Sequence, residues 1–181
     1  MEKNYLESTG KLFRYYKSLG EKAMAQLSEN QLREEPAPDS NNIATIVKHL
    51  RGNMLSRWTD FLSSDGEKTW RERDREFEDT LETQKDIVAA WEAGWNCLFE
   101  ALDPLRPEDL SRIVYIRNEG HTVLEAINRQ LAHYAYHVGQ IVFLAKQLKG
   151  TEFQSLSIPK GASKTYNQEK FSQDKDRRHF V

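Results

Sequence analysis

Two histidines four residues apart, His133 and His137, are the side chains of this sequence whose spacing best suits metal chemistry. They lie in HTVLEAINRQLAHYAYHVGQIVFLAK, whose apolar periodicity predicts a helix. Residues four apart share one helix face, with Cβ atoms about 5–6 Å apart, so both imidazoles can bind one ion. His49, in the second predicted helix NIATIVKHLRGNM, can supply a third ligand. The sequence therefore predicts a divalent-metal site formed by His49, His133 and His137.

Three neutral imidazoles form a donor set that catalytic zinc centres use, with one coordination position open to water. Imidazole also suits nickel, copper and iron, so the ligand type does not identify the metal. The expected cofactor is a divalent ion, with zinc, nickel, iron and manganese as the candidates. Such an ion can acidify water or a thiol, or polarise a carbonyl. The segment HYAYH has no glutamate between its histidines, which disfavours metalloprotease chemistry. The alternative is that the histidines are packed, hydrogen-bonded structural residues.

Two polar residues precede His133 by about one helical turn, Arg129 and Gln130, and are the candidates for substrate binding. The alternative for each is an ordinary ion pair or polar contact on the helix surface. Gln130, Asn53 and Tyr136 are candidates for hydrogen bonds that orient the metal ligands. The sequence identifies no catalytic residue.

The remaining histidines and the single cysteine have simpler interpretations. His121 lies three helical turns before His133, about 18 Å away at 1.5 Å per residue, and is expected to cap the helix or lie at the surface. His179 lies in the polar tail and is expected to be solvated. Cys97 lies on a helix rich in aromatic residues and is expected to be a buried thiol.

Four long helices must position these side chains. Periodicity and capping residues place them at about residues 3–27, from after Asn42 to about 63, at Thr83–Leu102, and from the N-cap Thr122 to about Lys149, with Gly150 following. The charged stretch Asp65–Glu82 is expected to be a long, exposed connection. A short β-branched and aromatic run at 113–116 is expected to be extended.

These elements favour an all-α fold, a four-helix bundle over residues 1–150, followed by a C-terminal arm and polar tail over 151–181. Segment 155–163 of the arm can either close over the metal site or pack along a neighbouring subunit. Trp91 and Trp95 are expected in the core or in a dimer interface. The inward-facing residues of the third helix are expected to be Ile87, Val88, Trp91, Trp95, Leu98 and Leu102.

Composition narrows the class of protein. The 181 residues carry 26 basic and 28 acidic side chains with interleaved signs, which disfavours nucleic-acid binding as the main activity. The longest apolar run, IVFLA, is too short to span a bilayer, and the N-terminal residues lack the apolar core of a signal peptide. A single cysteine fits a reducing compartment, so a cytoplasmic location without a membrane partner is expected.

Three stretches carry a resemblance to a known family: NIATIVKHLRGNM, IRNEGHTVLEAINRQLAHYAYHVGQIVFLAK and SLSIPKGASKTYN. Over roughly residues 5–167 the chain resembles the DinB-like metal-binding superfamily, in particular a branch of uncharacterised bacterial proteins. The resemblance implies a four-helix bundle, commonly a homodimer, with a divalent ion held by one histidine of the second helix and an HxxxH pair of the fourth. Those positions are His49, His133 and His137 here.

Some members of that superfamily use the ion to activate a small thiol such as bacillithiol, mycothiol or glutathione, while others are damage-inducible proteins without an assigned reaction. The first hypothesis is therefore a metal-dependent hydrolase or thiol S-transferase that acts on small molecules. The second is a non-catalytic metal-binding or stress-associated dimer. The third is a helical interaction module with structural histidines. The arm SLSIPKGAS differs from that of the thiol-transferase relatives, which counts against thiol transfer.

Overall fold

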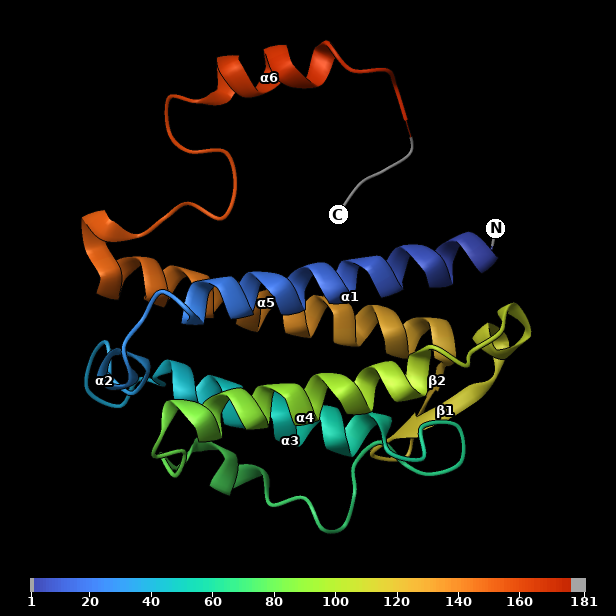
Figure 1. Cartoon of the computed structure of the whole chain (residues 1–181). Helices are drawn as coiled ribbons and strands as arrows, with labels where there is room; N and C mark the ends of the chain where they lie inside the picture. The colour runs from blue at the N-terminus through green and yellow to red at the C-terminus, as the bar shows by residue number, and fades with distance from the viewer. Residues whose placement is uncertain (1, 177–181) are drawn as a thin grey trace.

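The computed structural model describes residues 2–176, which form a mostly helical fold with one small β-hairpin. Four long helices lie side by side, with α1 packed along α5 and α3 packed along α4 (Figure 1). The helices are α1 (Glu2–Met24), α2 (Glu29–Leu32), α3 (Ile43–Trp58), α4 (Gln84–Leu102), α5 (Val123–Lys149) and α6 (Ser163–Phe171). The remaining elements are the 3-10 helices η1 (Arg73–Phe77), η2 (Pro107–Ser111) and η3 (Gly150–Glu152), and the strands β1 (Ile113–Ile116) and β2 (Glu119–Thr122).

Local capping explains where the long helices begin. The Asn42 side chain accepts a hydrogen bond from the Thr45 backbone at 2.8 Å, which satisfies a free N–H group at the start of α3. Thr122 and Glu125 form the predicted capping box of α5. At the other end of α5, Gly150 has φ 61, a conformation that glycine adopts without steric cost. The predicted start and end of α5 are therefore confirmed.

The helix ends and one core position differ from the sequence-based expectations. Helix α1 ends at Met24 and α3 at Trp58, each several residues earlier than predicted, because the following residues turn into loops. Val88 was predicted to face inwards, and this prediction is wrong: its side chain is 47% exposed. The run 113–116 is extended as expected and pairs antiparallel with β2, so the fold is mostly rather than purely helical.

Each of the four long helices contributes one large aromatic side chain to the centre of the core. Phe13 of α1, Trp58 of α3, Trp95 of α4 and Tyr134 of α5 lie with ring centroids 5.9–6.5 Å apart in four pairs. The buried Tyr134 hydroxyl accepts a hydrogen bond from Trp58 Nε1 at 2.9 Å and donates one to Asn53 Oδ1 at 3.0 Å. This cluster holds α5 against α3, the two helices that carry the histidines.

The tryptophan pair of α4 belongs to this core. Both Trp91 and Trp95 are buried within the chain, with ring centroids 5.4 Å apart, so the alternative of a dimer interface is wrong. The Trp91 ring lies against the backbone of α1 at Gly20. A Cβ atom at Gly20 would stand 2.5 Å from Trp91 Cη2, closer than real atoms approach.

Gly20→Ala should therefore destabilise the protein by about 1–3 kcal/mol, because the buried Trp91 ring cannot move aside without repacking the core. Gly10→Ala is the matched control on the same helix, since its Cβ would meet open space among the described residues. The control should raise stability by up to about 1 kcal/mol through better helix propensity. Urea unfolding of both variants measures the difference, and equal effects would contradict the tight α1–α4 contact.

A single carboxylate anchors the β-hairpin. Asp65 accepts hydrogen bonds from the backbone N–H groups of Glu67, Arg117 and Asn118 at 2.7–2.9 Å. Arg117 and Asn118 form the hairpin turn with φ 56 and 61, a conformation that non-glycine residues adopt only at a cost. Asp65 thus ties the connection after α3 to a turn that is otherwise unfavourable.

The pKa of Asp65 reflects these contacts. Desolvation acts to raise the pKa, but the three backbone hydrogen bonds outweigh it and hold the pKa below its ordinary value. A depressed pKa means that the carboxylate stabilises the fold above about pH 4 and loses this effect as pH falls through the folded-state pKa. Asp65→Asn should cost about 1 kcal/mol at pH 7. Unfolding at pH 7 and pH 3 measures the difference in stability between the variant and the wild type. This difference should be smaller at pH 3, and an equal difference at both pH values would contradict the role of the carboxylate.

The C-terminal arm leaves the bundle after η3. Gln154 exchanges two hydrogen bonds with Gln26, at 2.7 and 3.1 Å, and Phe153 and Leu156 pack against the core. Beyond them, every residue of α6 is exposed, and the helix lies apart from the four long helices (Figure 1). The prediction of a solvated His179 lies outside the described residues.

None of the described helices has the length and apolar character needed to cross a membrane.

Candidate metal centre

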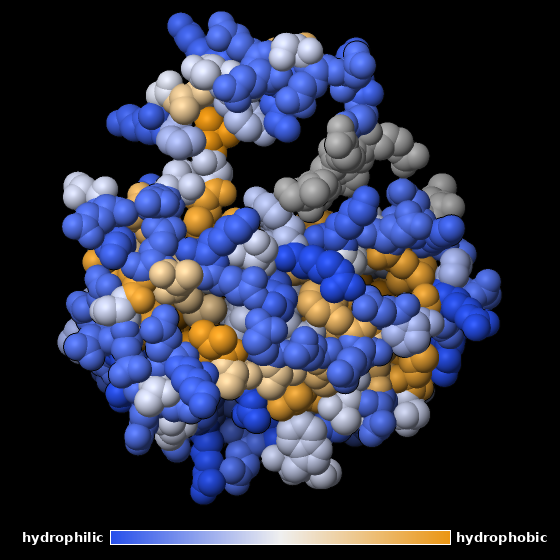
Figure 2. All heavy atoms as spheres, viewed as in Figure 1, coloured by the Kyte–Doolittle hydropathy of each residue, from blue (hydrophilic) through white to orange (hydrophobic). Residues whose placement is uncertain are grey.

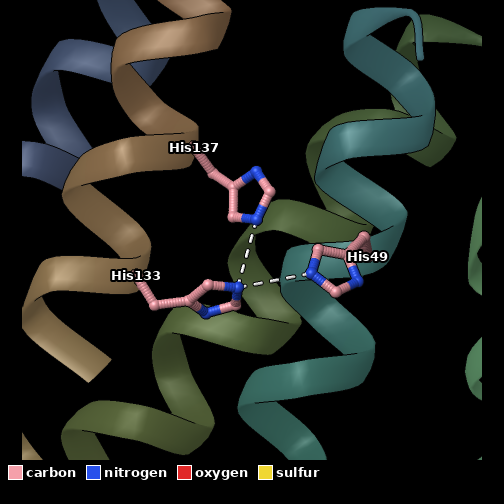
Figure 3. A group of neighbouring side chains, drawn as sticks. All are labelled: His49, His133 and His137. Atoms are coloured by element: carbon pink, nitrogen blue, oxygen red, sulfur yellow. Dashed lines mark hydrogen bonds between the residues drawn. The ribbon is translucent and has the colours of Figure 1, made fainter. Parts of the chain in front are cut away.

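The three predicted ligands come together between α3 and α5. His49 faces His133 and His137 across the gap between the two helices, and the ring nitrogens point toward one another (Figure 3). His133 Nε2 lies 3.4 Å from His49 Nε2 and 3.1 Å from His137 Nε2. One potential ligand atom from each residue falls within 4.8 Å of the other two.

These separations can be compared with those of a bound ion. At a metal–nitrogen distance of about 2.0–2.1 Å, tetrahedral geometry places ligand nitrogens about 3.3–3.4 Å apart. The two pairs that involve His133, at 3.1 and 3.4 Å, agree with this spacing, and the third pair lies within 4.8 Å. The residues therefore fit a small divalent ion.

Hydrogen bonds to the far side of two rings leave their Nε2 atoms free to bind. His49 Nδ1 donates to the Glu76 carboxylate at 2.9 Å, and His137 Nδ1 donates to Gln140 Oε1 at 2.7 Å. A neutral imidazole that donates from Nδ1 carries its lone pair on Nε2. A proton on His133 Nε2 can be donated to only one of these two lone pairs at a time. A cation at the centre would bind both lone pairs at once.

Burial keeps two of the histidines in the form that binds metal. Desolvation, together with the nearby His137, His49 and two arginines, lowers the pKa of His133 to about 3. Desolvation also lowers the pKa of His137, against the opposing effect of the hydrogen bond that the ring donates to Gln140. Both rings are thus neutral near pH 7, the protonation state required of an imidazole ligand.

Sequence analysis missed one acidic residue at this site. The connection Asp65–Glu82 was predicted to be simply exposed, and this is wrong for its central part, where η1 packs on α3 and Glu76 is 6% exposed. Desolvation acts to raise the pKa of Glu76, but hydrogen bonds from His49 and Arg71 keep it below the ordinary value. The next residue, Phe77, stacks on the His49 ring at 5.0 Å. An aromatic residue inside a run of charges was the available signal.

In the described part of the chain, none of the three predicted supporting residues makes a hydrogen bond to a histidine of the cluster. Asn53 binds the Tyr134 hydroxyl, and Tyr136 reaches His137 only through Gln140, whose Nε2 donates to the Tyr136 hydroxyl at 3.1 Å. Gln130 is buried, and its Oε1 has no hydrogen-bond partner within residues 2–176.

The two candidates for substrate binding occupy different environments. Arg129 is exposed, whereas Gln130 is buried and lines a small void that Arg57 also lines. Within residues 2–176 neither makes a hydrogen bond to the three histidines. Their role in substrate binding stays a prediction.

Two other reactive side chains stand apart from the centre. His121 lies on β2 and is not a member of the three-histidine group. Cys97 is half-buried, with its Sγ 3.6 Å from the Thr59 hydroxyl, and burial raises the pKa of the thiol. A raised pKa disfavours the nucleophilic thiolate.

The fold and the site together define a mostly helical protein with a buried cluster of three histidines between two long helices. The protein-family model described as "Protein of unknown function (DUF1572)" matches residues 1–162. The chain belongs to this family. None of the curated proteins compared with the chain gave a significant match.

Proposed function

We propose that this protein binds one divalent ion through His49, His133 and His137, in the manner of DinB-like proteins. The observation that carries the proposal is the convergence of three Nε2 atoms, with two separations of 3.1 and 3.4 Å that suit a tetrahedral ion. We further propose that the ion activates water or a small thiol, which makes the protein a metal-dependent hydrolase or thiol S-transferase for small molecules in the cytoplasm.

The composition of the site supports catalysis over a purely structural ion. Among residues 2–176, the cluster contains three donors, with no fourth histidine, cysteine or carboxylate in the group. Glu76, the nearest acidic residue to His49, is engaged by the far nitrogen of that ring. Structural zinc sites usually have four protein ligands, whereas catalytic sites keep one position for water or substrate. A three-ligand site fits the second type.

Metal content tests the proposal directly. Untagged protein, reconstituted separately with zinc, nickel, iron and manganese, should contain about one ion per chain when measured by inductively coupled plasma mass spectrometry. His133→Ala and His49→Ala should each lose the ion, because two imidazoles hold it weakly. His121→Ala is the matched control and should keep it. A wild-type protein that takes up no metal would overturn the proposal and favour structural histidines.

A second candidate is a non-catalytic metal-binding homodimer, which an exposed face of α5 favours. Ala132, Tyr136, Gly139 and Phe143 recur at spacings of four, three and four residues, the pattern of helices that pack together. Tyr136 is 62% exposed and Phe143 is 69% exposed. Figure 2 shows apolar side chains among the polar ones on the face that it presents. Light scattering would measure the mass, and hydrolytic and thiol-transfer assays on the loaded protein would separate the two candidates.

A further inference from the structure

We infer that Glu76 is a positioning residue of the metal centre, and that Arg71 holds its carboxylate in the space that Gly52 leaves open. The inference rests on the proposed function, since it assigns to the connection after α3 the task of aiming His49 at the ion. His49 is the only one of the three proposed ligands on α3. Its alignment with the pair on α5 therefore needs support that the HxxxH spacing cannot provide.

Both oxygens of the Glu76 carboxylate are engaged. Oε2 accepts from His49 Nδ1 at 2.9 Å and from Arg71 Nη2 at 2.9 Å, while Oε1 accepts from Arg71 Nε at 2.7 Å. This two-point contact with the planar guanidinium fixes the plane of the carboxylate as well as its position. Because Phe77 stacks on the His49 ring, the imidazole is restrained both along its edge and on one face.

Gly52 makes room for the carboxylate. It lies three residues after His49, on the same side of α3. A Cβ atom at this position would stand 2.2 Å from Glu76 Oε1 and 2.6 Å from its carboxyl carbon. Any larger residue would push the carboxylate away from His49. A glycine within a helix costs about 1 kcal/mol relative to alanine, so the close approach of Glu76 explains its presence here.

The charges behind Glu76 extend the same support. Arg71 also donates to Glu67 at 3.1 Å, and Glu67 accepts from Arg57 at 2.9 Å. The side chains of Glu76, Arg71 and Arg57 are almost fully buried. Buried ion pairs add little net stability, because desolvation offsets most of the attraction. These charges therefore have a second role, which is to hold the Glu76 carboxylate against the His49 ring.

Three variants test the inference through ion affinity. Competition with a chromophoric chelator should show zinc and cobalt(II) bound about 10–100-fold more weakly in Glu76→Gln, which keeps the shape of the side chain but loses its charge. Gly52→Ala should weaken binding similarly although Glu76 itself is unchanged, because the new methyl group displaces the carboxylate. Gly10→Ala, the same substitution in open space, should bind as the wild type does. Circular dichroism checks that each variant is folded.

The visible absorption of bound cobalt(II) separates positioning from a general loss of stability. The bands should shift or weaken in Glu76→Gln and Gly52→Ala, because the His49 ring rotates, and should stay unchanged in Gly10→Ala. Wild-type affinity and spectra in both Glu76→Gln and Gly52→Ala would overturn the inference and leave the proposed function intact. A wild-type protein that binds neither of these ions, nor nickel, iron or manganese, would overturn both.

Discussion

Zinc at about 1,000 times its dissociation constant is expected to raise the free energy of unfolding by about 4 kcal/mol. For a chain of this size that corresponds to a rise in Tm of about 8–16 °C. The physical reason is that the folded state brings three imidazoles together from α3 and α5. In the unfolded chain His49 is far from His133 and His137, so the ion binds the folded state. Calorimetry of metal-free protein with and without zinc measures the shift.

His133→Ala should abolish this shift, since His133 lies between the other two proposed ligands, with its Nε2 3.4 Å from His49 Nε2 and 3.1 Å from His137 Nε2. In the metal-free state the same variant relieves a crowded, desolvated imidazole whose Nδ1 lacks a partner among the described residues. Its own Tm without zinc should therefore fall little. His121→Ala should keep the full shift. An equal response to zinc in wild type and His133→Ala would contradict the proposed site.

Trp95→Ala is expected to cost about 3–5 kcal/mol of stability. Trp95 is fully buried and contacts aromatic side chains from three helices, with Phe13 at 6.5 Å, Trp91 at 5.4 Å and Tyr134 at 5.9 Å between ring centroids. Removing the indole leaves a cavity that these rigid neighbours cannot close. Urea unfolding followed by far-UV circular dichroism measures the loss.

Val88→Ala on the same helix is the matched control. Its side chain is 47% exposed, so truncation should change stability by no more than about 0.5 kcal/mol. Because the two positions are seven residues apart, a continuous apolar stripe would place both inwards. Comparable losses at both positions would mean that Val88 is covered in solution, for instance by a second copy of the chain.

Local signals in the sequence were sufficient to predict the four long helices, although not the ends of α1 and α3. The N-cap at Asn42, the capping box of Thr122 and Glu125 and the glycine after Lys149 set the helix limits through hydrogen bonds between close neighbours in the chain. The HxxxH spacing likewise put His133 and His137 on one face of α5, because helical geometry alone decides that. The apolar pattern of α4 wrongly predicted that Val88 faces inwards, because its exposure depends on which helices are neighbours.

Tertiary structure decided how the centre is completed. Sequence patterns predicted His49 as a third ligand. Only the packing of α3 against α5 brings its Nε2 to 3.4 Å from His133 Nε2. Glu76 and Arg71 lie in a charged stretch whose composition predicts exposure, yet they are buried because they neutralise one another and His49 supplies a further hydrogen bond. Pairing between charges has no periodicity along the chain, so the sequence cannot predict it. These pairs form only when the connection after α3 folds back over Gly52.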